Sequence, residues 1–196
     1  MTTGNNSRCG FVAIVGRPNV GKSTLLNALV GEKVSIVSAK PHTTRHRVLG
    51  VLNNDADQVV FLDTPGLQSD RKHALHRFMA KTISQVLAEA DITLMVIEAG
   101  RFSRQDKQLA ELLRDNAERT ILVLNKIDMV KAKSDLLPIL KSVAVDFPFA
   151  AFVPISARGS KNLGGLLAEI LSRLPEGSPL YPREMVTDRN LNFRIS

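Results

Sequence analysis

The stretch that decides the fold is residues 16–23, which read Gly16-Arg17-Pro18-Asn19-Val20-Gly21-Lys22-Ser23. They match G-x-x-x-x-G-K-[ST], the pattern of a phosphate-binding loop. An apolar, β-branched run at 11–15 precedes them and predicts a buried strand. Residues 24–29 follow them and predict a helix that ends near Gly31. A strand, a glycine-containing loop and a helix in this order are the context in which the pattern binds phosphate.

Each part of this loop predicts a contact with a nucleotide. Gly16 and Gly21 let the backbone approach a phosphate closely, and the successive N–H groups and the helix N-terminus attract its negative charge. We expect Lys22 to reach the β- and γ-phosphates and the Ser23 hydroxyl to bind Mg²⁺. The loop specifies neither the base nor hydrolysis. The residues predicted to bind the nucleotide here are Gly16, Arg17, Pro18, Asn19, Val20, Gly21, Lys22, Ser23 and Thr24.

Composition places the chain among globular proteins. It has 196 residues, 44% of them hydrophobic, which fits one domain with its own core. No apolar run approaches the roughly 18–20 residues of a membrane span, and residues 1–9 lack the apolar core of a secretory signal. A single cysteine excludes an internal disulfide and fits a reducing cytosol. The net charge of +7 favours a polyanionic partner, either nucleic acid or an anionic membrane surface; a well-solvated surface is the alternative.

Strand and helix signals alternate along the chain, which predicts an α/β fold. We expect a mixed, mostly parallel, six-stranded sheet with helices on both faces. The turn signal at 53–55 joins two strands as an antiparallel hairpin, so the sheet should be mixed. The predicted strands after the first are 48–52, 59–62, 92–97, 120–124 and 151–155. The predicted helices after the first are 75–90, 104–116, 134–145 and 163–174.

Two motifs predict contacts around the γ-phosphate. Ligands of such sheets bind outside the carboxyl ends of the strands, and Asp63-Thr64-Pro65-Gly66 directly follows the strand 59–62. Asp63 can hold Mg²⁺ through water, and the Gly66 N–H can bond the γ-phosphate. Thr43 and Thr44 lie in the polar loop 35–47, where a threonine can reach both groups. The spacing does not choose between the two threonines; we prefer Thr44.

Two further motifs predict recognition of the base. Asn125-Lys126-Ile127-Asp128 follows the strand 120–124, and the Asp128 carboxylate can accept two hydrogen bonds from guanine. Adenine lacks that donor pair, and leaving the carboxylate unpaired costs about 1–3 kcal/mol or more. Asn125 could bond the opposite edge of the base or brace the phosphate loop, while the Lys126 stem could pack on the ring. Ser156-Ala157 could offer a backbone N–H to guanine O6.

The order of these motifs resembles the five-motif signature of translation-factor-type GTPases, with GRPNVGKSTLLN, HTTRHR, DTPGL, NKID and ISA as motifs one to five. Over residues 9–196 the chain is most similar to the Era family of bacterial ribosome-associated GTPases. The DLLPIL and LPEG segments and the YPREMVTDRNLNFR tail separate it from the related Der family, which has two such domains in tandem. The resemblance implies a P-loop GTPase fold, with a flexible N-terminus at 1–9, an Era-type GTPase domain at 10–175 and a linker or tail at 176–196.

The resemblance also implies a function. It implies binding of GTP and its slow hydrolysis to GDP and phosphate, in a nucleotide switch for assembly of the small ribosomal subunit with its 16S rRNA. The implied catalytic groups are Lys22, Thr44 and Gly66, and the implied Mg²⁺ ligands are Ser23, Thr44 and Asp63. Leu67 stands where Ras-type GTPases place the glutamine that orients water, so hydrolysis should rely on other help. Some relatives bind K⁺ through the asparagine equivalent to Asn19; a plain turn residue is the alternative.

Several alternatives remain open from the sequence. Era proteins continue into an RNA-binding KH domain with a G-x-x-G clamp, so we expect the chain to be a GTPase-domain fragment or a truncated relative. The basic segments 35–47 and 63–77 should respond to the γ-phosphate and are candidates for an RNA-facing surface. We expect a cytoplasmic monomer, with peripheral association at the inner face of the cell membrane also open. The rival functions are an ATP-using kinase or ATPase, a non-catalytic GTP-gated binding module and a membrane-surface protein; the GTPase domain of a related ribosome-assembly GTPase such as Der is a further alternative.

Overall fold

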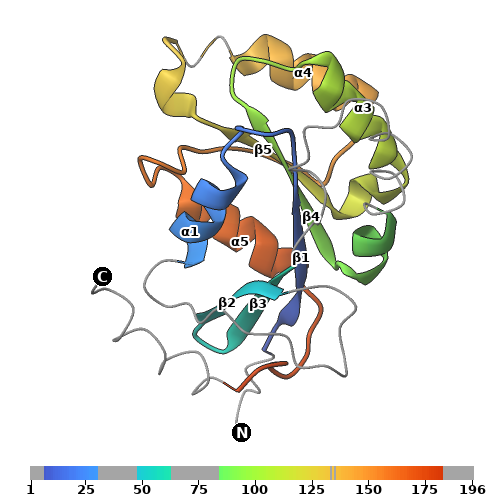
Figure 1. Ribbon diagram of the computed structural model, residues 1–196, viewed down its shortest axis with the longest axis vertical. Coiled ribbons are helices and arrows are strands. Elements are labelled where there is room, and N and C mark those ends of the chain that lie inside the picture. Colours follow the sequence, from blue (N-terminus) through green and yellow to red (C-terminus); the bar gives the residue numbers. More distant parts are fainter. Residues whose placement is uncertain (1–6, 31–47, 63–83, 133, 135, 183–196) are drawn as a thin grey trace, which may run out of the picture.

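A computed structural model describes residues 7–30, 48–62, 84–132, 134 and 136–182 (Figure 1). Six strands form one sheet in the order β2-β3-β1-β4-β5-β6. Their bounds are Cys9–Val15 for β1, Val48–Asn54 for β2, Asp57–Leu62 for β3, Ile92–Glu98 for β4, Thr120–Asn125 for β5 and Ala151–Pro154 for β6. Only β2 and β3 pair antiparallel; the other neighbours are parallel. The mixed, mostly parallel, six-stranded sheet is therefore confirmed.

Helices cover both faces of the sheet (Figure 1). Leu25 of one helix and Ile170 of another pack in one core cluster, whereas Leu109 and Val143 of two other helices pack in a second. The bounds are Lys22–Val30 for α1, Arg104–Leu112 for α3, Leu136–Asp146 for α4 and Leu163–Arg173 for α5. Two 3-10 helices, η2 at Arg114–Arg119 and η3 at Ile127–Met129, join these elements. Within the described residues, none of the helices combines the length and apolar character that a membrane crossing needs.

The central strands are apolar because both of their faces are covered. Every residue of β5 is buried, and its side chains alternate between the two clusters: Val123 packs in one, Leu122 and Leu124 in the other. Strands of a parallel sheet that lies between helices read as near-continuous hydrophobic runs for this reason. Each such aliphatic side chain stabilises the fold by about 1.5–3 kcal/mol through its burial. This rigid core holds the strand ends that carry the polar motifs.

Two predicted elements differ in detail. The helix expected at 104–116 ends as α3 at Leu112, and η2 follows it with a non-helical Asn116 at φ −115° and ψ 18°. The Asn116 carbonyl accepts a 2.8 Å hydrogen bond from the Thr120 hydroxyl, which turns the chain into β5. The hairpin turn begins after Asn54, and Asp55 takes φ 48°, a conformation that aspartate tolerates. Of the helix expected at 75–90, residues 84–89 are helical and 75–83 lie outside the described residues.

Residues at the two ends of the described chain pair with each other. The Gly177 N–H donates to the Ser7 carbonyl at 2.8 Å, and the Cys9 N–H donates to the Pro175 carbonyl at 3.1 Å. The Arg8 guanidinium also donates to the Leu174 carbonyl at 2.8 Å. β1 therefore begins two residues earlier than the sequence predicts, and its start is tied to the end of α5.

Residues 175–181, named the strap here, continue along the sheet beyond the predicted end of the domain at 175. Gln58 of β3 is fully buried and bonds the strap twice. Its amide nitrogen donates to the Tyr181 carbonyl at 2.9 Å, and its amide oxygen accepts from the Tyr181 N–H at 2.9 Å. The backbone groups of Pro175, Gly177 and Tyr181 make the strap's hydrogen bonds to the strands and to Ser7. Backbone contacts leave no hydrophobic period, so the sequence pattern does not reveal the strap. Residues 183–196 of the predicted tail lie outside the described residues.

Candidate nucleotide-binding site

The predicted motifs of the described residues gather at the carboxyl edge of the sheet. β1 ends at Val15 and leads through the loop 16–21 into α1 (Figure 1). β5 ends at Asn125, whose side chain bonds Val20 of that loop. Parallel strands place their carboxyl ends at one edge. The phosphate-loop and base motifs are 104 residues apart at Gly21 and Asn125, yet the fold brings them into contact.

Glycine is required at two positions of the phosphate loop. Gly21 has φ +97°, and a Cβ there would lie 2.3 Å from the Asn125 side-chain nitrogen. A Cβ at Gly16 would lie 2.4 Å from the Val96 carbonyl oxygen. Asn19 also takes a left-handed conformation, with φ 65°, which asparagine adopts more readily than most residues. The loop therefore needs small or turn-forming residues at the positions where the sequence has them.

Lys22, the first residue of α1, folds back over the loop. Its ammonium group donates to the carbonyl oxygens of Gly16 at 2.8 Å and Arg17 at 2.7 Å. Burial lowers the pKa of Lys22 from its ordinary value. The first turn of α1 has no acidic residue to offset the partial positive charge of the helix N-terminus, and Ser23 and Thr24 are exposed on that turn. A cationic side chain, free helix N–H groups and exposed hydroxyls together can bind an anion.

Asn125 connects the phosphate loop to the base motifs. Its side-chain nitrogen donates to the Val20 carbonyl at 2.9 Å, and its side-chain oxygen accepts from the N–H groups of Ala157 at 2.9 Å and Lys126 at 2.8 Å. The side chain is almost completely buried. Of the two roles expected for Asn125, the structure shows the bracing of the loop.

The Asp128 carboxylate is exposed but held in place. The Ser156 hydroxyl donates to its Oδ1 atom. This hydrogen bond is the largest cause that lowers the pKa of Asp128, and the positive charges of Lys161 and Arg158 lower it further. The carboxylate is therefore an acceptor, as recognition of guanine requires.

Ser156 and Ala157, expected to offer a backbone N–H to the base, make hydrogen bonds within the protein. The Ser156 N–H donates to the Lys161 carbonyl at 3.2 Å, and the Ala157 N–H donates to Asn125. Both backbone donors therefore have acceptors inside the protein. What the pair supplies is the Ser156 hydroxyl that orients Asp128, a contact that a two-residue motif does not specify.

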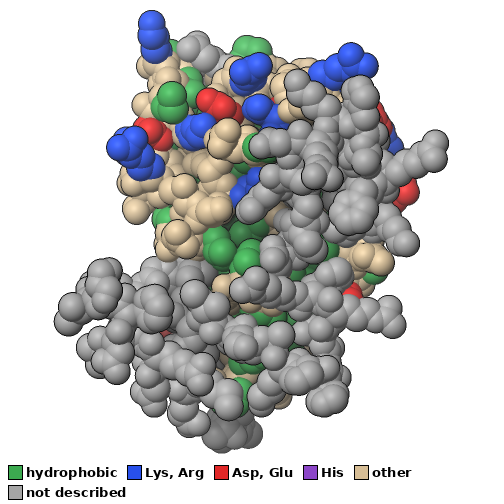
Figure 2. Space-filling model, in the orientation of Figure 1, with side chains coloured by type: hydrophobic (Ala, Val, Ile, Leu, Met, Phe, Trp, Pro, Cys, Tyr) green, Lys and Arg blue, Asp and Glu red, His purple; other side chains and the backbone are tan. Residues whose placement is uncertain are grey.

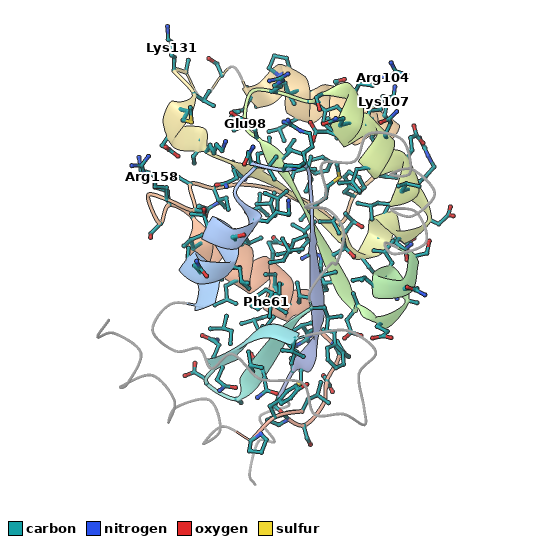
Figure 3. The ribbon with its side chains drawn as sticks, in the orientation of Figure 1. Phe61, Glu98, Arg104, Lys107, Lys131 and Arg158 are labelled. Atoms are coloured by element: carbon teal, nitrogen blue, oxygen red, sulfur yellow. The ribbon has the colours of Figure 1, made fainter. Side chains whose placement is uncertain are left out.

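Lys126 is fixed by its backbone and its charge. It takes a left-handed conformation with φ 68°, and its ammonium group lies 3.5 Å from the Glu98 carboxylate at the end of β4. Glu98 and the exposed Arg158 lie at the same end of the molecule (Figure 3). The Lys126 side chain is about one-third exposed, at 29%, so its stem has a free face on which a ring could pack.

Apart from Lys22, the side chains and N–H groups expected at the γ-phosphate, and most of the expected Mg²⁺ ligands, lie outside the described residues. These residues are Thr43, Thr44, Asp63, Thr64, Pro65, Gly66 and Leu67. Of the predicted Mg²⁺ ligands, Ser23 alone is described, with an exposed hydroxyl at the start of α1. The described part of the chain has no group of three or more His, Cys, Asp or Glu that could hold a metal. A hydroxyl beside a phosphate site fits Mg²⁺, which proteins commonly bind through few side chains and the substrate's phosphates.

An ion pair that no sequence motif predicts joins the phosphate loop to α3. The Arg17 Nε atom lies 2.8 Å from Oδ1 of Asp106, whose carboxylate is fully buried. Asp106 also completes a capping box with Ser103 at the start of α3. The available signal was the S-x-x-D pattern of that box, which predicts a helix start but no partner in the loop.

Comparison with known proteins gives the family. Residues 11–126 match the family model of the 50S ribosome-binding GTPases. The chain belongs to this family. Among curated members it is 50% identical to the GTPase Era of Bordetella petrii over 186 residues, which are 95% of this chain and 62% of that protein. The chain thus spans about three-fifths of the length of the Era GTPases it matches, and the expected resemblance to Era is confirmed.

Solved structures of Era agree with this membership. A variant of Era from Aquifex aeolicus bound to GDP·AlF4⁻ is 43% identical, with a TM-score of 0.74, over 92% of this chain and 62% of that one. An Era complex with MgGDPNP and nucleotides 1506–1542 of 16S ribosomal RNA has the same identity, 43%, and TM-score, 0.74, over 93% of this chain and 62% of that one. The P-loop GTPase fold is therefore confirmed.

Proposed function

We propose that the protein binds GTP, hydrolyses it slowly to GDP and phosphate, and acts as a nucleotide switch in assembly of the small ribosomal subunit. The observation that carries the proposal is the position of Asn125, which bonds the phosphate loop at Val20 and the base segment at Ala157, each at 2.9 Å. One buried side chain thereby sets the spacing between a phosphate site and a guanine site. Era relatives bound to GDP·AlF4⁻ and to MgGDPNP support the same reading.

Selection of guanine rests on Asp128. Its carboxylate is held by Ser156, whose hydrogen bond lowers the pKa and favours the ionised form, so it can accept from the N1–H and the exocyclic amine of guanine. Adenine presents no such donor pair, and the unpaired carboxylate would weaken binding by about 1–3 kcal/mol. The position of the Asp128 carboxylate therefore favours binding of GTP over ATP, and a GTPase over an ATP-using kinase or ATPase.

Hydrolysis is a matter of positioning and charge neutralisation. Lys22 and the N–H groups of the loop would hold the phosphates, and the Gly66 N–H would contact the γ-phosphate. Ser23, Thr44 and Asp63 would hold Mg²⁺, which supplies charge neutralisation at the β- and γ-phosphates. Leu67 cannot orient the attacking water as a glutamine does. We expect turnover on the order of 10⁻³ s⁻¹, which corresponds to a barrier of about 21 kcal/mol.

K⁺ is a proposed second cation, with Asn19 as its ligand. Asn19 is exposed in the phosphate loop at φ 65°, and its side chain carries an amide oxygen of the kind that binds cations. A plain turn residue would have the same conformation, so dependence on the ion decides between them. Phosphate release that is equal in K⁺ and Na⁺ would remove Asn19 from the site.

The proposed partners are the 16S rRNA and the small subunit, since an Era relative binds a 16S segment. In this chain Lys and Arg side chains gather over the end that holds the site (Figure 2). The exposed ones that Figure 3 labels there are Arg104, Lys107, Lys131 and Arg158. We propose a cytoplasmic monomer; peripheral association with the inner face of the cell membrane is the alternative that the charge also fits.

Multiple-turnover phosphate release from GTP and from ATP tests the proposal. We expect slow release from GTP, little from ATP, and loss of release in Lys22→Ala. Equal use of ATP would favour the kinase or ATPase alternative. Tight GTP binding without any release would leave the non-catalytic binding module.

A further inference from the structure

We propose that Asp106 of α3 is a positioning residue for the phosphate loop and acts through Arg17. The inference rests on the proposed nucleotide binding and adds to the site a residue that none of its motifs contains. Asp106 is fully buried, at 0% exposure. A buried carboxylate is unfavourable unless charged and polar partners surround it, and the partners of Asp106 lie on two different elements.

The two carboxylate oxygens divide between those elements. Oδ2 accepts from the Ser103 N–H at 2.8 Å and the Ser103 hydroxyl at 2.6 Å, which completes the cap of α3. Oδ1 accepts from Arg17 Nε at 2.8 Å. The helix cap needs only Oδ2, so the bond from Oδ1 is an additional link to the loop.

Arg17 transmits this link to Lys22. The Arg17 side chain is 14% exposed and bonds Asp106, while its carbonyl accepts from the Lys22 ammonium group at 2.7 Å. The residue before it, Gly16, has a permissive backbone and gives the peptide 16–17 little restraint of its own. Anchoring the Arg17 side chain therefore fixes the carbonyl that holds Lys22.

The pair differs from the ion pairs on the helix surfaces. Arg114 and Glu111 lie 2.9 Å apart within one stretch of chain, with side chains 50% and 47% exposed. Exposed pairs of this kind contribute little. The pair of Arg17 and Asp106 is buried, and it joins two elements 89 residues apart in sequence. Among the described residues, the second terminal nitrogen of Arg17 is buried with no hydrogen-bond partner, so the bond from Nε is what aligns the guanidinium there.

Titration of GDP into three variants of the whole chain tests the inference. Asp106→Asn keeps the size and an acceptor for Ser103 but removes the charge that holds Arg17. We expect roughly tenfold weaker GDP binding in Asp106→Asn and in Arg17→Met, as loss of a charged hydrogen bond predicts. The double variant should lose no more than either single variant, because both changes break one link. Glu111→Gln, on the same helix, is the control and should bind GDP as the wild type does.

A thermal melt of each variant separates positioning from mere stabilisation. If Asp106 only capped α3, GDP affinity of Asp106→Asn far below Tm would stay at the wild-type value, whatever the change in Tm; that result would overturn the inference. Arg17→Met leaves the cap intact, so unchanged GDP affinity in that variant, or losses that add in the double variant, would overturn it as well. Each of these three outcomes leaves the proposed function standing if the wild type binds GDP. A wild type that binds no GDP would refute the proposed function and this inference with it.

Discussion

Replacing Gly21 with alanine should damage stability and nucleotide binding together. The residue has φ +97°, and an added Cβ would lie 2.3 Å from the Asn125 side-chain nitrogen. The left-handed backbone costs an L-residue about 1–2 kcal/mol. Displacing Asn125 breaks its bond to the Val20 carbonyl inside the protein, at about 1–3 kcal/mol. The sum, about 2–5 kcal/mol, is a large part of the 5–15 kcal/mol that stabilises a typical domain.

Urea unfolding and calorimetric titration with GDP measure the two effects. We expect a lower unfolding midpoint and at least tenfold weaker GDP binding in Gly21→Ala. Gly164→Ala in α5 is the matched control, since nothing lies within 4 Å of its added Cβ. Alanine in that helix should leave GDP binding unchanged and stabilise the protein by up to about 1 kcal/mol.

A second variant checks the cause of the damage. Among the described residues, and apart from the chain neighbours of Gly21, the atoms within 4 Å of the added Cβ belong to the Asn125 side chain. In an Asn125→Ala background, Gly21→Ala should therefore add only the backbone cost of about 1–2 kcal/mol. An unfolding midpoint and a GDP affinity in Gly21→Ala that match the control would refute the reasoning, as would a double variant whose losses are fully additive.

Three further variants, at Ser156, Leu122 and Gln58, test other parts of the structure. Ser156→Ala should narrow the preference for GDP over ADP in competition binding. Because folding lowers the pKa of Asp128, its ionised carboxylate stabilises the folded state above the ordinary carboxyl pKa of 3.8, and this stabilisation is lost as the pH falls through the pKa of the folded state. When urea unfolding is measured over a series of acidic pH values, the free energy of unfolding of Ser156→Ala should therefore fall less steeply with pH than that of the wild type. Leu122→Ala, in the core, should cost about 2–5 kcal/mol by calorimetry. Gln58→Leu should release Tyr181 from the sheet, which faster proteolytic cleavage within the strap would report.

The sheet was predictable because its strands are buried on both faces. β4 contains the apolar run 94–97 and β5 the apolar run 121–124, and the two-residue turn that begins at Asp55 marks the hairpin of β2 and β3. The phosphate loop and the base motif could also be predicted from the sequence, because their function requires particular residue types at fixed spacing. A buried strand and a binding motif each leave a pattern within a short stretch of the sequence.

The missed features are long-range polar contacts. The ion pair of Arg17 and Asp106 spans 89 residues, and the bonds from Gln58 to Tyr181 span 123. Neither contact produces a hydrophobic period or a fixed motif spacing in the sequence, because the donor and the acceptor of a hydrogen bond can lie at any two positions of the chain. The role of the Ser156 hydroxyl was missed for the same reason: only the fold places it against Asp128.

The pairing of the two ends of the described chain has a consequence for synthesis. The Ser7 hydroxyl donates to the Gly177 carbonyl, 170 residues later. Ribosomes add about 5–20 residues each second, so the nascent β1 waits roughly 10–30 s for its last partners. Asp106 and Asn125, whose side chains contact the phosphate loop, are synthesised earlier, 89 residues after Arg17 and 105 residues after Val20. We expect nascent chains stalled before residue 175 to expose the start of β1 to chaperones, and chains that extend well past 177 outside the ribosome to hide it.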